Sequence, residues 1–312
     1  MTKTRVKRKG RPVNGILLLD KPQGITSNGA LQQVKRLFGA QKAGHTGSLD
    51  PIATGVLPIC FGEATKFSRF LLEADKRYLA TFKLGISTAT GDSEGEIIET
   101  RPVVGRSRKD LEAVLADYIG EIEQVPSMFS AIKQNGQPLY KLARQGIEVE
   151  RKARKVRIAS MRLVDFSEDE LVLNIECSKG TYVRSLAEDI GEDLGCGAHV
   201  SALRRLRAGP FDIDASFTLP ELIDRKENAD GELDELLLSA RSAVRDWPCS
   251  VLSALTASYL MQGQSVQVPN SPRSGWVSLF QEVEDDANFI GVGEILDDGR
   301  IAPRRLVAMQ KG

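Results

Sequence analysis

The sequence predicts an α+β protein with a large domain at residues 14–250 and a small β domain at residues 251–312. Two observations support this division. In the large domain, short apolar runs typical of buried strands precede segments in which apolar residues recur at helical spacing. After residue 250, the chain consists of short β-like runs broken by glycine, asparagine, proline and aspartate. A chain of 312 residues is long enough to form both domains.

The first predicted elements are a strand and a helix. GILLLD at residues 15–20 is a short apolar run closed by the turn residues KPQG, which favours a buried strand. Thr26 or Ser27 is expected to cap the helix that follows. Its apolar residues keep the i, i+3, i+4, i+7 spacing and are Ala30, Leu31, Val34, Leu37 and Phe38. RYLATFKLGI at residues 77–86 predicts another strand, and DLEAVLADYIG at residues 110–120 predicts a helix ended by its glycine.

A second strand and helix are predicted later in the large domain. LVLNIEC at residues 171–177 has the pattern of a buried strand and is followed by the turn SKGTY. The next helix carries Val183, Leu186, Ala187, Ile190 and Leu194. Gly195 and Gly197 can end it. The acidic stretch 221–246 is expected to be a helical connector, and Asp298-Gly299 marks a hairpin turn in the small domain.

The composition is that of an ordinary globular protein, with 41% apolar and 27% charged residues. No apolar run is long enough to span a bilayer, and the N-terminus has no secretory apolar region, so we expect a soluble, cytoplasmic protein. The cysteines are widely scattered and form no CxxC pair: Cys60, Cys177, Cys196 and Cys249. The chain has only two histidines, His45 and His199. The sequence therefore indicates neither a disulfide framework nor a zinc site.

Charges are sorted into blocks along the chain although the formal net charge is zero. Residues 1–45 hold ten basic side chains against Asp20 alone, and residues 133–163 hold nine against two glutamates. Residues 211–250 hold ten acidic side chains against four basic ones. Basic blocks fit a nucleic-acid backbone, and they fit a solvated tail and an exposed charged face about equally well. We expect residues 1–13 to form a flexible basic tail.

Asp50 is the only carboxylate between Lys21 and Gly62. Because Pro51 follows it, Asp50 has the pattern of a helix N-cap. Gly55 and Pro58 leave room for little more than one helical turn, so capping alone explains this aspartate poorly. The glycines of GHTGSLDPIATG permit a tightly folded loop, and loops of this kind often carry catalytic groups.

A carboxylate that must stay ionised needs a nearby cation. Arg184 begins a predicted helix, where the helix dipole disfavours a positive charge, so an anionic partner would explain its position. The alternative is an ordinary exposed arginine. GEATK lacks the spacing of a phosphate loop, GCG lacks the context of a dinucleotide fingerprint, and no GxSxG elbow is present. Asp50 is therefore the best-placed nucleophile, working without metal or organic cofactor, and His199 is expected to be structural.

GHTGSLDPIATGVLPICFGEATK resembles the signature of the TruB family of tRNA pseudouridine synthases. Further segments resemble the family in its order: LLLDKPQGITS, DKRYLATFKLG, PSMFSAIKQNGQPLYKLARQG, CSKGTYVRSLAEDIG and GAHVSALRRLR. The likeness covers most of residues 14–210. It implies a pseudouridine-synthase fold with a mixed, mainly antiparallel sheet flanked by helices. GVGEILDDGRIAPRRL is similar to the end of a PUA domain, which implies that residues 251–312 form a small RNA-binding β-barrel.

The resemblance implies a role for each matching position. Asp50 matches the nucleophile, Tyr78 the tyrosine that stacks on the target base and is a candidate proton acceptor, and Arg184 the arginine paired with the aspartate. The implied substrate contacts are His45 on the T loop, Tyr182 and Leu203 along the uracil pocket, and Lys21 and Pro22 as the buttress beneath the site. Phe129 stands where relatives often have tyrosine. From the pattern alone, the default interpretation of Tyr78 is a core tyrosine of a strand, with its hydroxyl at the rim.

The implied activity is isomerisation of uridine to pseudouridine at position 55, in the T loop of tRNA, by base flipping and an aspartate nucleophile. The implied partner is tRNA, bound by a monomer with no obligate protein partner and no membrane. A base inside a folded loop must be flipped into a pocket and stacked before its glycosidic bond can be rearranged. Two alternatives remain: a non-catalytic RNA-binding or RNA-folding protein, and a guide-dependent pseudouridine synthase acting on another RNA. A pure binder has no need for Asp50, Tyr78 and Arg184 together.

Overall fold

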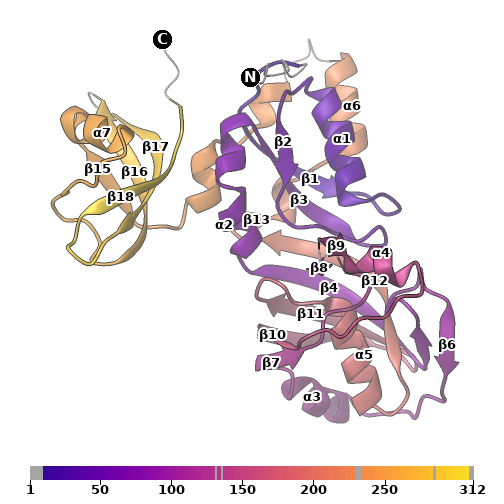
Figure 1. The fold of residues 1–312 in the computed structure, drawn as a ribbon. Coiled ribbons are helices and arrows are strands. Elements are labelled where there is room, and N and C mark those ends of the chain that lie inside the picture. Colours follow the sequence, from indigo (N-terminus) through magenta and orange to yellow (C-terminus); the bar gives the residue numbers. More distant parts are fainter. Residues whose placement is uncertain (1–9, 131, 135, 229–232, 284–285, 309–312) are drawn as a thin grey trace.

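A computed structural model describes residues 10–130, 132–134, 136–228, 233–283 and 286–308 of the chain (Figure 1). The helices, with 3₁₀ turns named η, are α1 (Ser27–Leu37), η1 (Gly62–Lys66), α2 (Ser68–Glu73), α3 (Arg108–Ala116), α4 (Leu139–Ala143), α5 (Val183–Asp193), η2 (Ile213–Ala215), α6 (Leu219–Asn228), η3 (Leu233–Leu236), η4 (Ala240–Val244) and α7 (Ala254–Met261). In these ranges no helix is long and apolar enough to cross a membrane. The predicted basic side chains before Gly10 lie outside the described residues.

One large mixed sheet runs through the first domain. Its strands are β1 (Gly15–Lys21), β2 (Ala43–His45), β3 (Thr54–Phe61), β4 (Lys76–Leu84), β7 (Gly120–Gln124), β10 (Arg154–Phe166), β11 (Glu170–Cys177), β12 (Ala198–Ala208), β13 (Phe211–Asp212) and β14 (Phe217–Thr218). The order is β14-β1-β3-β12-β4-β11-β10-β7, with β13 on β12 and β2 on β3. Among the described residues, only the β1–β14 and β3–β12 pairs of this sheet are parallel. The predicted mixed, mainly antiparallel sheet flanked by helices is confirmed.

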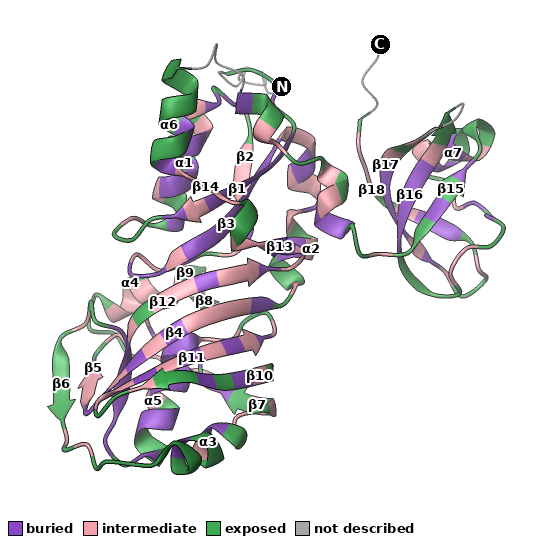
Figure 2. Cartoon of the chain, turned by 180° about the vertical axis from the view of Figure 1, so that it is seen from behind, coloured by how far each residue is buried: buried purple, intermediate pink, exposed green. Residues whose placement is uncertain are grey.

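Helices and short hairpins complete this domain. Two small antiparallel hairpins stand apart from the main sheet: β5 (Ile86–Thr88) with β6 (Ile97–Thr100), and β8 (Lys133–Gln134) with β9 (Gln137–Pro138). Helices α3 and α5 lie on one side of the β4, β10 and β11 region, whereas α1 and α6 lie together beside β1 (Figure 1). Strand β6, which is exposed along its length, lies at the edge of the domain (Figure 2).

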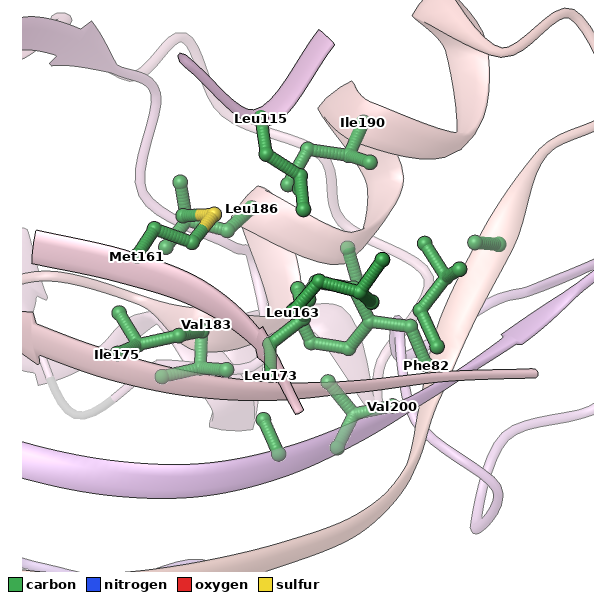
Figure 3. Packing of buried hydrophobic residues seen from close by; sticks show 14 of the residues in the cluster. Phe82, Leu115, Met161, Leu163, Leu173, Ile175, Val183, Leu186, Ile190 and Val200 are labelled. Carbon is green, nitrogen blue, oxygen red and sulfur yellow. The ribbon is translucent and has the colours of Figure 1, made fainter. Parts of the chain in front are cut away.

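The burial of each strand follows from the helices that cover it. Every side chain of β1 except Asp20 is buried, because elements pack on both of its faces. Strand β11 instead alternates buried and half-buried residues, since α5 covers only one face. Its buried side chains Leu173 and Ile175 pack against Leu186 and Ile190 of α5 (Figure 3). The strands predicted at residues 15–20, 77–86 and 171–177 are confirmed as β1, β4 and β11, and β11 is buried on one face only.

The predicted helices are confirmed, with one wrong end. Thr26 caps α1, and its side-chain oxygen accepts a hydrogen bond from the Gly29 N–H at 3.0 Å. Helix α3 begins after Ser107, which forms a capping box, and it ends at Ala116. Gly120 therefore does not end this helix. It has a positive φ of 110° and begins β7.

Part of the predicted flexible tail is packed against the domain. Val13 is only 2% exposed, and the Arg11 guanidinium binds the carboxylate of Asp234 at 2.6 Å. The predicted acidic connector contains α6, η3 and η4, so it is largely helical in its described part. Asp234 belongs to this connector. One basic and one acidic block thus meet within the molecule.

The C-terminal part forms a sheet of its own. It contains β15 (Cys249–Leu252), β16 (Gly275–Val283), β17 (Asp286–Ile295) and β18 (Ile301–Leu306), in that order. The hairpin at Asp298-Gly299 is confirmed, because Gly299 has a φ of 80° and donates to the Leu296 carbonyl at 2.9 Å. The pairings among the described residues make an open sheet, so a closed barrel stays a prediction. The domain boundary at residue 251 also stays a prediction.

Aromatic side chains join this sheet to the first domain. The Phe70 ring of α2 lies 4.8 Å from Trp247 and 5.1 Å from Trp276 between ring centroids. Phe67 lies 5.6 Å from Phe289 of β17. Beside them, the Lys66 ammonium donates to the Leu306 carbonyl at 2.9 Å. Ring contacts and this hydrogen bond thus connect the C-terminal sheet to the first domain.

Lys76 predicts a specific pH dependence of stability. Its ammonium is buried at the end of α2 and donates to the Leu72 carbonyl at 2.7 Å, and burial lowers its pKa to about 8 from 10.5. The unfolded chain therefore binds more protons between those values, so this residue makes the free energy of unfolding rise with pH there. Between pH 8 and 10, the free energy of unfolding of the wild type should rise more steeply with pH than that of Lys76→Met. The slopes should differ by at most about 1.4 kcal/mol per pH unit. Denaturant unfolding across this range measures it, and parallel curves would contradict it.

Candidate active site

The loop that carries Asp50 is held at both ends by the sheet. It connects β2 to β3, and these two strands form an antiparallel pair. Gly55 has a φ of 105°, and a Cβ there would lie 2.2 Å from the backbone oxygen of Arg205 in β12. Only glycine fits this position, so the loop closes directly against the neighbouring strand. Asp50 itself lies in no helix; its carbonyl accepts from Ala53 N–H at 3.0 Å in a turn. The interpretation of Asp50 as a helix cap is therefore wrong.

Hydrogen bonds from α1 and the turn before it fix the residues on either side of Asp50. The buried Ser27 hydroxyl donates to the Leu49 carbonyl at 2.9 Å and accepts from the Leu49 N–H at 2.7 Å. The Gly24 N–H donates to the Pro51 carbonyl at 2.8 Å. Ser27 was predicted only as a possible cap, and its place under the loop follows from the tertiary contact alone.

Arg184 lies between two carboxylates. Its Nη2 is 3.1 Å from Asp50 Oδ2, and its Nη1 is 3.4 Å from Asp92 Oδ2. Nη1 also donates to the Thr90 carbonyl at 2.9 Å, and Nη2 donates to the Phe129 carbonyl at 3.0 Å. The guanidinium is 6% exposed, whereas the Asp50 side chain is 44% exposed. Buried partners thus hold the Arg184 guanidinium in place, whereas the Asp50 side chain is partly exposed to solvent. Phe129 contributes through its backbone, so this contact does not depend on its ring.

Sequence reasoning missed Asp92. It lies in a turn of the β5–β6 hairpin and is 3% exposed. Its carboxylate also accepts from the Glu94 N–H at 3.1 Å. An aspartate in a glycine-rich turn has the pattern of an ordinary turn residue. Its burial against Arg184 became visible only in the fold.

The electrostatic surroundings of Asp50 oppose one another. Burial raises the pKa of its carboxyl above the ordinary value, Arg184 acts to lower it, Asp92 acts to raise it, and Lys21 acts to lower it. The pKa is raised overall, so the two cations favour the ionised, nucleophilic form but offset burial and the neighbouring acid only in part. An ionised carboxylate with an exposed oxygen can attack an electrophilic carbon delivered from solvent.

Tyr78 and Leu203 stand on adjacent strands beside the loop. Tyr78 lies on β4 and Leu203 on β12, and both are half-buried against the two core clusters of the domain. Burial raises the pKa of the Tyr78 phenol; Arg205 and Cys177 act in opposite directions on it, and Asp50 raises it further. The charge of Asp50 thus acts electrostatically on the Tyr78 phenol. The predicted stacking and pocket-lining roles of these two residues remain proposals.

Tyr182 precedes α5, two residues before Arg184. Its backbone N–H and carbonyl are both hydrogen-bonded to the buried Gln124 side chain, at 3.0 and 3.1 Å. The Arg154 guanidinium lies over its ring, 4.8 Å from the centroid. Gln124 was not predicted, because a glutamine at the end of a strand carries no recognisable pattern.

Lys21, Pro22 and His45 surround the loop from the other side. The Lys21 ammonium is fully buried and donates to the carbonyls of Pro22 at 2.9 Å and Ile25 at 2.8 Å. Burial lowers its pKa to about 8, and Asp50 opposes this. Pro22 itself is exposed. Burial lowers the pKa of His45, with Arg205 acting in the same direction, so His45 is neutral near pH 7.

His199 has a structural place. It is 6% exposed in β12, and its Nδ1 lies 2.9 Å from the Ile86 carbonyl. The four cysteines are free thiols, with only Cys249 exposed. Within the described residues, no cluster of histidine, cysteine and acidic side chains could hold a metal ion.

Arg184, Tyr78 and Lys21, which come from separate segments, lie around the loop that carries Asp50. Family models match the chain along nearly its whole length. Residues 35–183 match the N-terminal domain of the TruB family pseudouridylate synthases. Residues 184–245 match the tRNA pseudouridylate synthase B C-terminal domain, and residues 248–307 match the pseudouridine synthase II TruB C-terminal domain.

Curated relatives cover almost the entire chain. It is 54% identical to tRNA pseudouridine synthase B of Ectopseudomonas mendocina (strain ymp) over 305 residues, which are 97% of this chain and 98% of that protein. It is 56% identical to tRNA pseudouridine synthase B of Coxiella burnetii (strain RSA 493 / Nine Mile phase I) over 298 residues, 95% of this chain and 96% of that protein.

Solved structures share the fold. A chain in the crystal structure of a Cbf5-Nop10-Gar1 complex matches with a TM-score of 0.71 and 26% identity, covering 90% of this chain and 78% of that one. A chain in the structure of an H/ACA RNP bound to a substrate RNA containing 2′-deoxyuridine matches with a TM-score of 0.72 and 22% identity, covering 97% and 91%. Sequence, family models and fold agree, and the chain belongs to the TruB family of pseudouridylate synthases.

Proposed function

We propose that this protein isomerises uridine to pseudouridine at position 55, in the T loop of tRNA, by base flipping and nucleophilic attack by Asp50. The observation that carries the proposal is the carboxylate of Asp50, partly exposed and 3.1 Å from a buried guanidinium. The relatives named tRNA pseudouridine synthase B, at 54–56% identity over nearly the full chain, support the substrate and the reaction.

The reaction has demands that these residues meet. The bond between N1 and C1′ must break, the uracil must rotate while it stays bound, and C5 must bond to C1′. C5 then loses a proton and N1 gains one, so the product is an isomer of the substrate. Attack by Asp50 on C1′ of the ribose or on C6 of the base holds one fragment covalently while the other rotates. No cofactor enters this scheme.

The remaining predicted residues surround the target nucleotide. Tyr78 stacks on the flipped base, with Tyr182 and Leu203 lining the rest of the uracil pocket. His45 contacts the T loop, and its neutral ring can accept or donate one hydrogen bond. Lys21 and Pro22 support the loop from beneath, where the Lys21 charge favours ionised Asp50.

The protein acts in the cytoplasm on tRNA alone, as a monomer with no obligate protein partner. Residues 251–312 form a PUA-like barrel that binds RNA and adds affinity without taking part in the chemistry.

Because Trp276 and Phe289 pack on the first domain, deleting residues 251–312 would expose apolar surface. Charge reversal at the exposed Arg305 is therefore the better test, and it should raise the dissociation constant for tRNA while leaving the saturating rate unchanged. An unaltered dissociation constant for tRNA would count against RNA binding at Arg305.

Incubation with an unmodified tRNA transcript, followed by mapping of pseudouridine, tests the function. One pseudouridine per molecule is expected, at position 55, and a transcript with cytidine at that position should remain unmodified. No product, or product only in a different RNA supplied with a guide, would reject the proposal. Binding without product would favour a non-catalytic RNA-binding protein.

A further inference from the structure

A buried arginine that the proposed reaction scheme does not use lies between the loop of Asp50 and the strand of Tyr78. Arg205 lies on β12 and is 1% exposed. In the sheet it stands opposite Tyr78 of β4 on one side and opposite Gly55 of β3 on the other. The pairing with β4 shifts register directly after it, between Arg205 and Arg207. Such a bulge re-aims the side chains beside it.

The Arg205 guanidinium holds the catalytic loop. Its Nε donates to the Val56 carbonyl at 2.7 Å, and its Nη2 donates to the Gly47 carbonyl at 3.2 Å. These two carbonyls lie on either side of Asp50 in the chain. Arg205 also stands directly opposite Tyr78 in the antiparallel pair of β12 and β4, so the two side chains are neighbours on one face of the sheet. One side chain thus joins the loop of the nucleophile to the strand position that faces Tyr78.

The charge of Arg205 has no acidic partner within the described part of the chain. Its neighbours on β12 do have one: Arg204 pairs with Asp20 at 2.7 Å, and Arg207 pairs with Glu176. Burying a cation without a carboxylate is costly, and such costs are concentrated at functional sites. Tyr78 is the titratable group that favours the charged form of Arg205.

The titratable groups around the phenol are Arg205 on β12, Cys177 on β11 and Asp50 on the loop. Burial raises the pKa of the Cys177 thiol to about 11, so this group is neutral near pH 7. Of the three groups, only Arg205 acts to lower the pKa of Tyr78; Cys177 and Asp50 act to raise it, as burial does. Burial is the largest effect and the pKa of Tyr78 is raised overall, so Arg205 is the group among these that offsets burial and favours a phenolate.

We propose that Arg205 is a positioning residue for proton transfer: it holds the Tyr78 phenol beside the loop of Asp50 and stabilises the phenolate that accepts the C5 proton. This rests on the proposed function. In that step the bond between C5 and its hydrogen breaks after C5 has bonded to C1′. The electron pair stays on the uracil ring, restoring its conjugation, and the proton passes to the Tyr78 oxygen, which becomes a neutral phenol. The proton that Tyr78 lost beforehand went to solvent, and N1 takes one from solvent.

A double-mutant cycle between Arg205→Gln and Tyr78→Phe tests the proposal. Arg205→Gln should lower the single-turnover rate constant on tRNA about 10²-fold, the size of a general-base contribution. In a plot of the rate constant against pH, the rise that reports ionisation of Tyr78 should also move to higher pH in Arg205→Gln, because the phenolate loses its neighbouring cation. In the Tyr78→Phe background the same change should cost clearly less than in the wild type, because only the contacts to the Gly47 and Val56 carbonyls then remain to be lost. Arg207→Gln, on the same strand but ion-paired with Glu176, is the matched control and should retain the wild-type profile.

A merely structural role for Arg205 predicts different results. The two losses would then multiply, and the rise of the rate constant with pH would not move; either result overturns the proposal. If the Arg205→Gln protein no longer melts cooperatively, Arg205→Lys replaces it in the same cycle. Its loss of rate should be smaller, and smaller again in the Tyr78→Phe background. Wild-type protein that forms no pseudouridine would reject the proposed function itself. Wild-type activity with additive Arg205 and Tyr78 losses would reject this inference alone.

Discussion

Asp50→Asn is expected to lower the single-turnover rate of pseudouridine formation by at least about 10⁴-fold, because removing a nucleophile eliminates the covalent route. The amide keeps the shape of the side chain and can still contact Arg184, so the loop should fold normally. Release of hydrogen from C5 of labelled uridine in tRNA measures the reaction.

Binding separates this result from misfolding. The dissociation constant for tRNA should stay within about threefold of wild type, since one side chain of a large interface is changed isosterically. Asp165→Asn, at an exposed position outside the site, serves as the control and should retain full activity. Turnover of Asp50→Asn near the wild-type rate would show that this carboxylate is not the nucleophile.

Arg184→Met should impair both catalysis and folding. The rate should fall about 10²- to 10³-fold, as for loss of an electrostatic contact in a buried site. Because Arg184 acts to lower the pKa of Asp50, its removal raises that pKa, and the acid limb of the rate profile should move to higher pH. The free energy of unfolding should fall by about 3–5 kcal/mol, since Asp92 is left buried without its cation.

A second substitution separates these two effects. Adding Asp92→Asn to Arg184→Met removes the stranded charge, so stability should recover in part while activity does not. Arg184→Lys keeps the charge but cannot bridge both carboxylates, and it should have intermediate activity. An acid limb that stays in place in Arg184→Met would contradict the electrostatic account of the pair. So would a melting temperature equal to that of the wild type.

The regular elements could be predicted because their signals are local. The apolar run of β1, the Thr26 cap of α1 and the glycine of the hairpin at residues 298–299 each act within a few residues. The end of α3 was missed because nothing in the sequence marks Ala116 as the last helical residue. Ends of helices depend on tertiary packing more than their starts do when no glycine or proline follows at once.

The site could be predicted only as far as its residues carry a motif. The isolated carboxylate of Asp50 and the misplaced charge of Arg184 suggested a pair, and the structure places them 3.1 Å apart. Asp92 and Arg205 gave no such signal, because their importance lies in burial and in partners from distant strands. A turn aspartate and one arginine within RRLR resemble ordinary surface residues until the sheet brings them inward.

The structure of Asp50→Asn bound to a T stem-loop RNA would test the central claim most directly. The account predicts that the uridine at position 55 is flipped out of the loop and stacked on Tyr78. C1′ or C6 should then lie within about 3.5 Å of the residue 50 side chain, the distance of a near-attack geometry. A uridine that stays stacked within the RNA loop, or one bound away from both Tyr78 and residue 50, would contradict it.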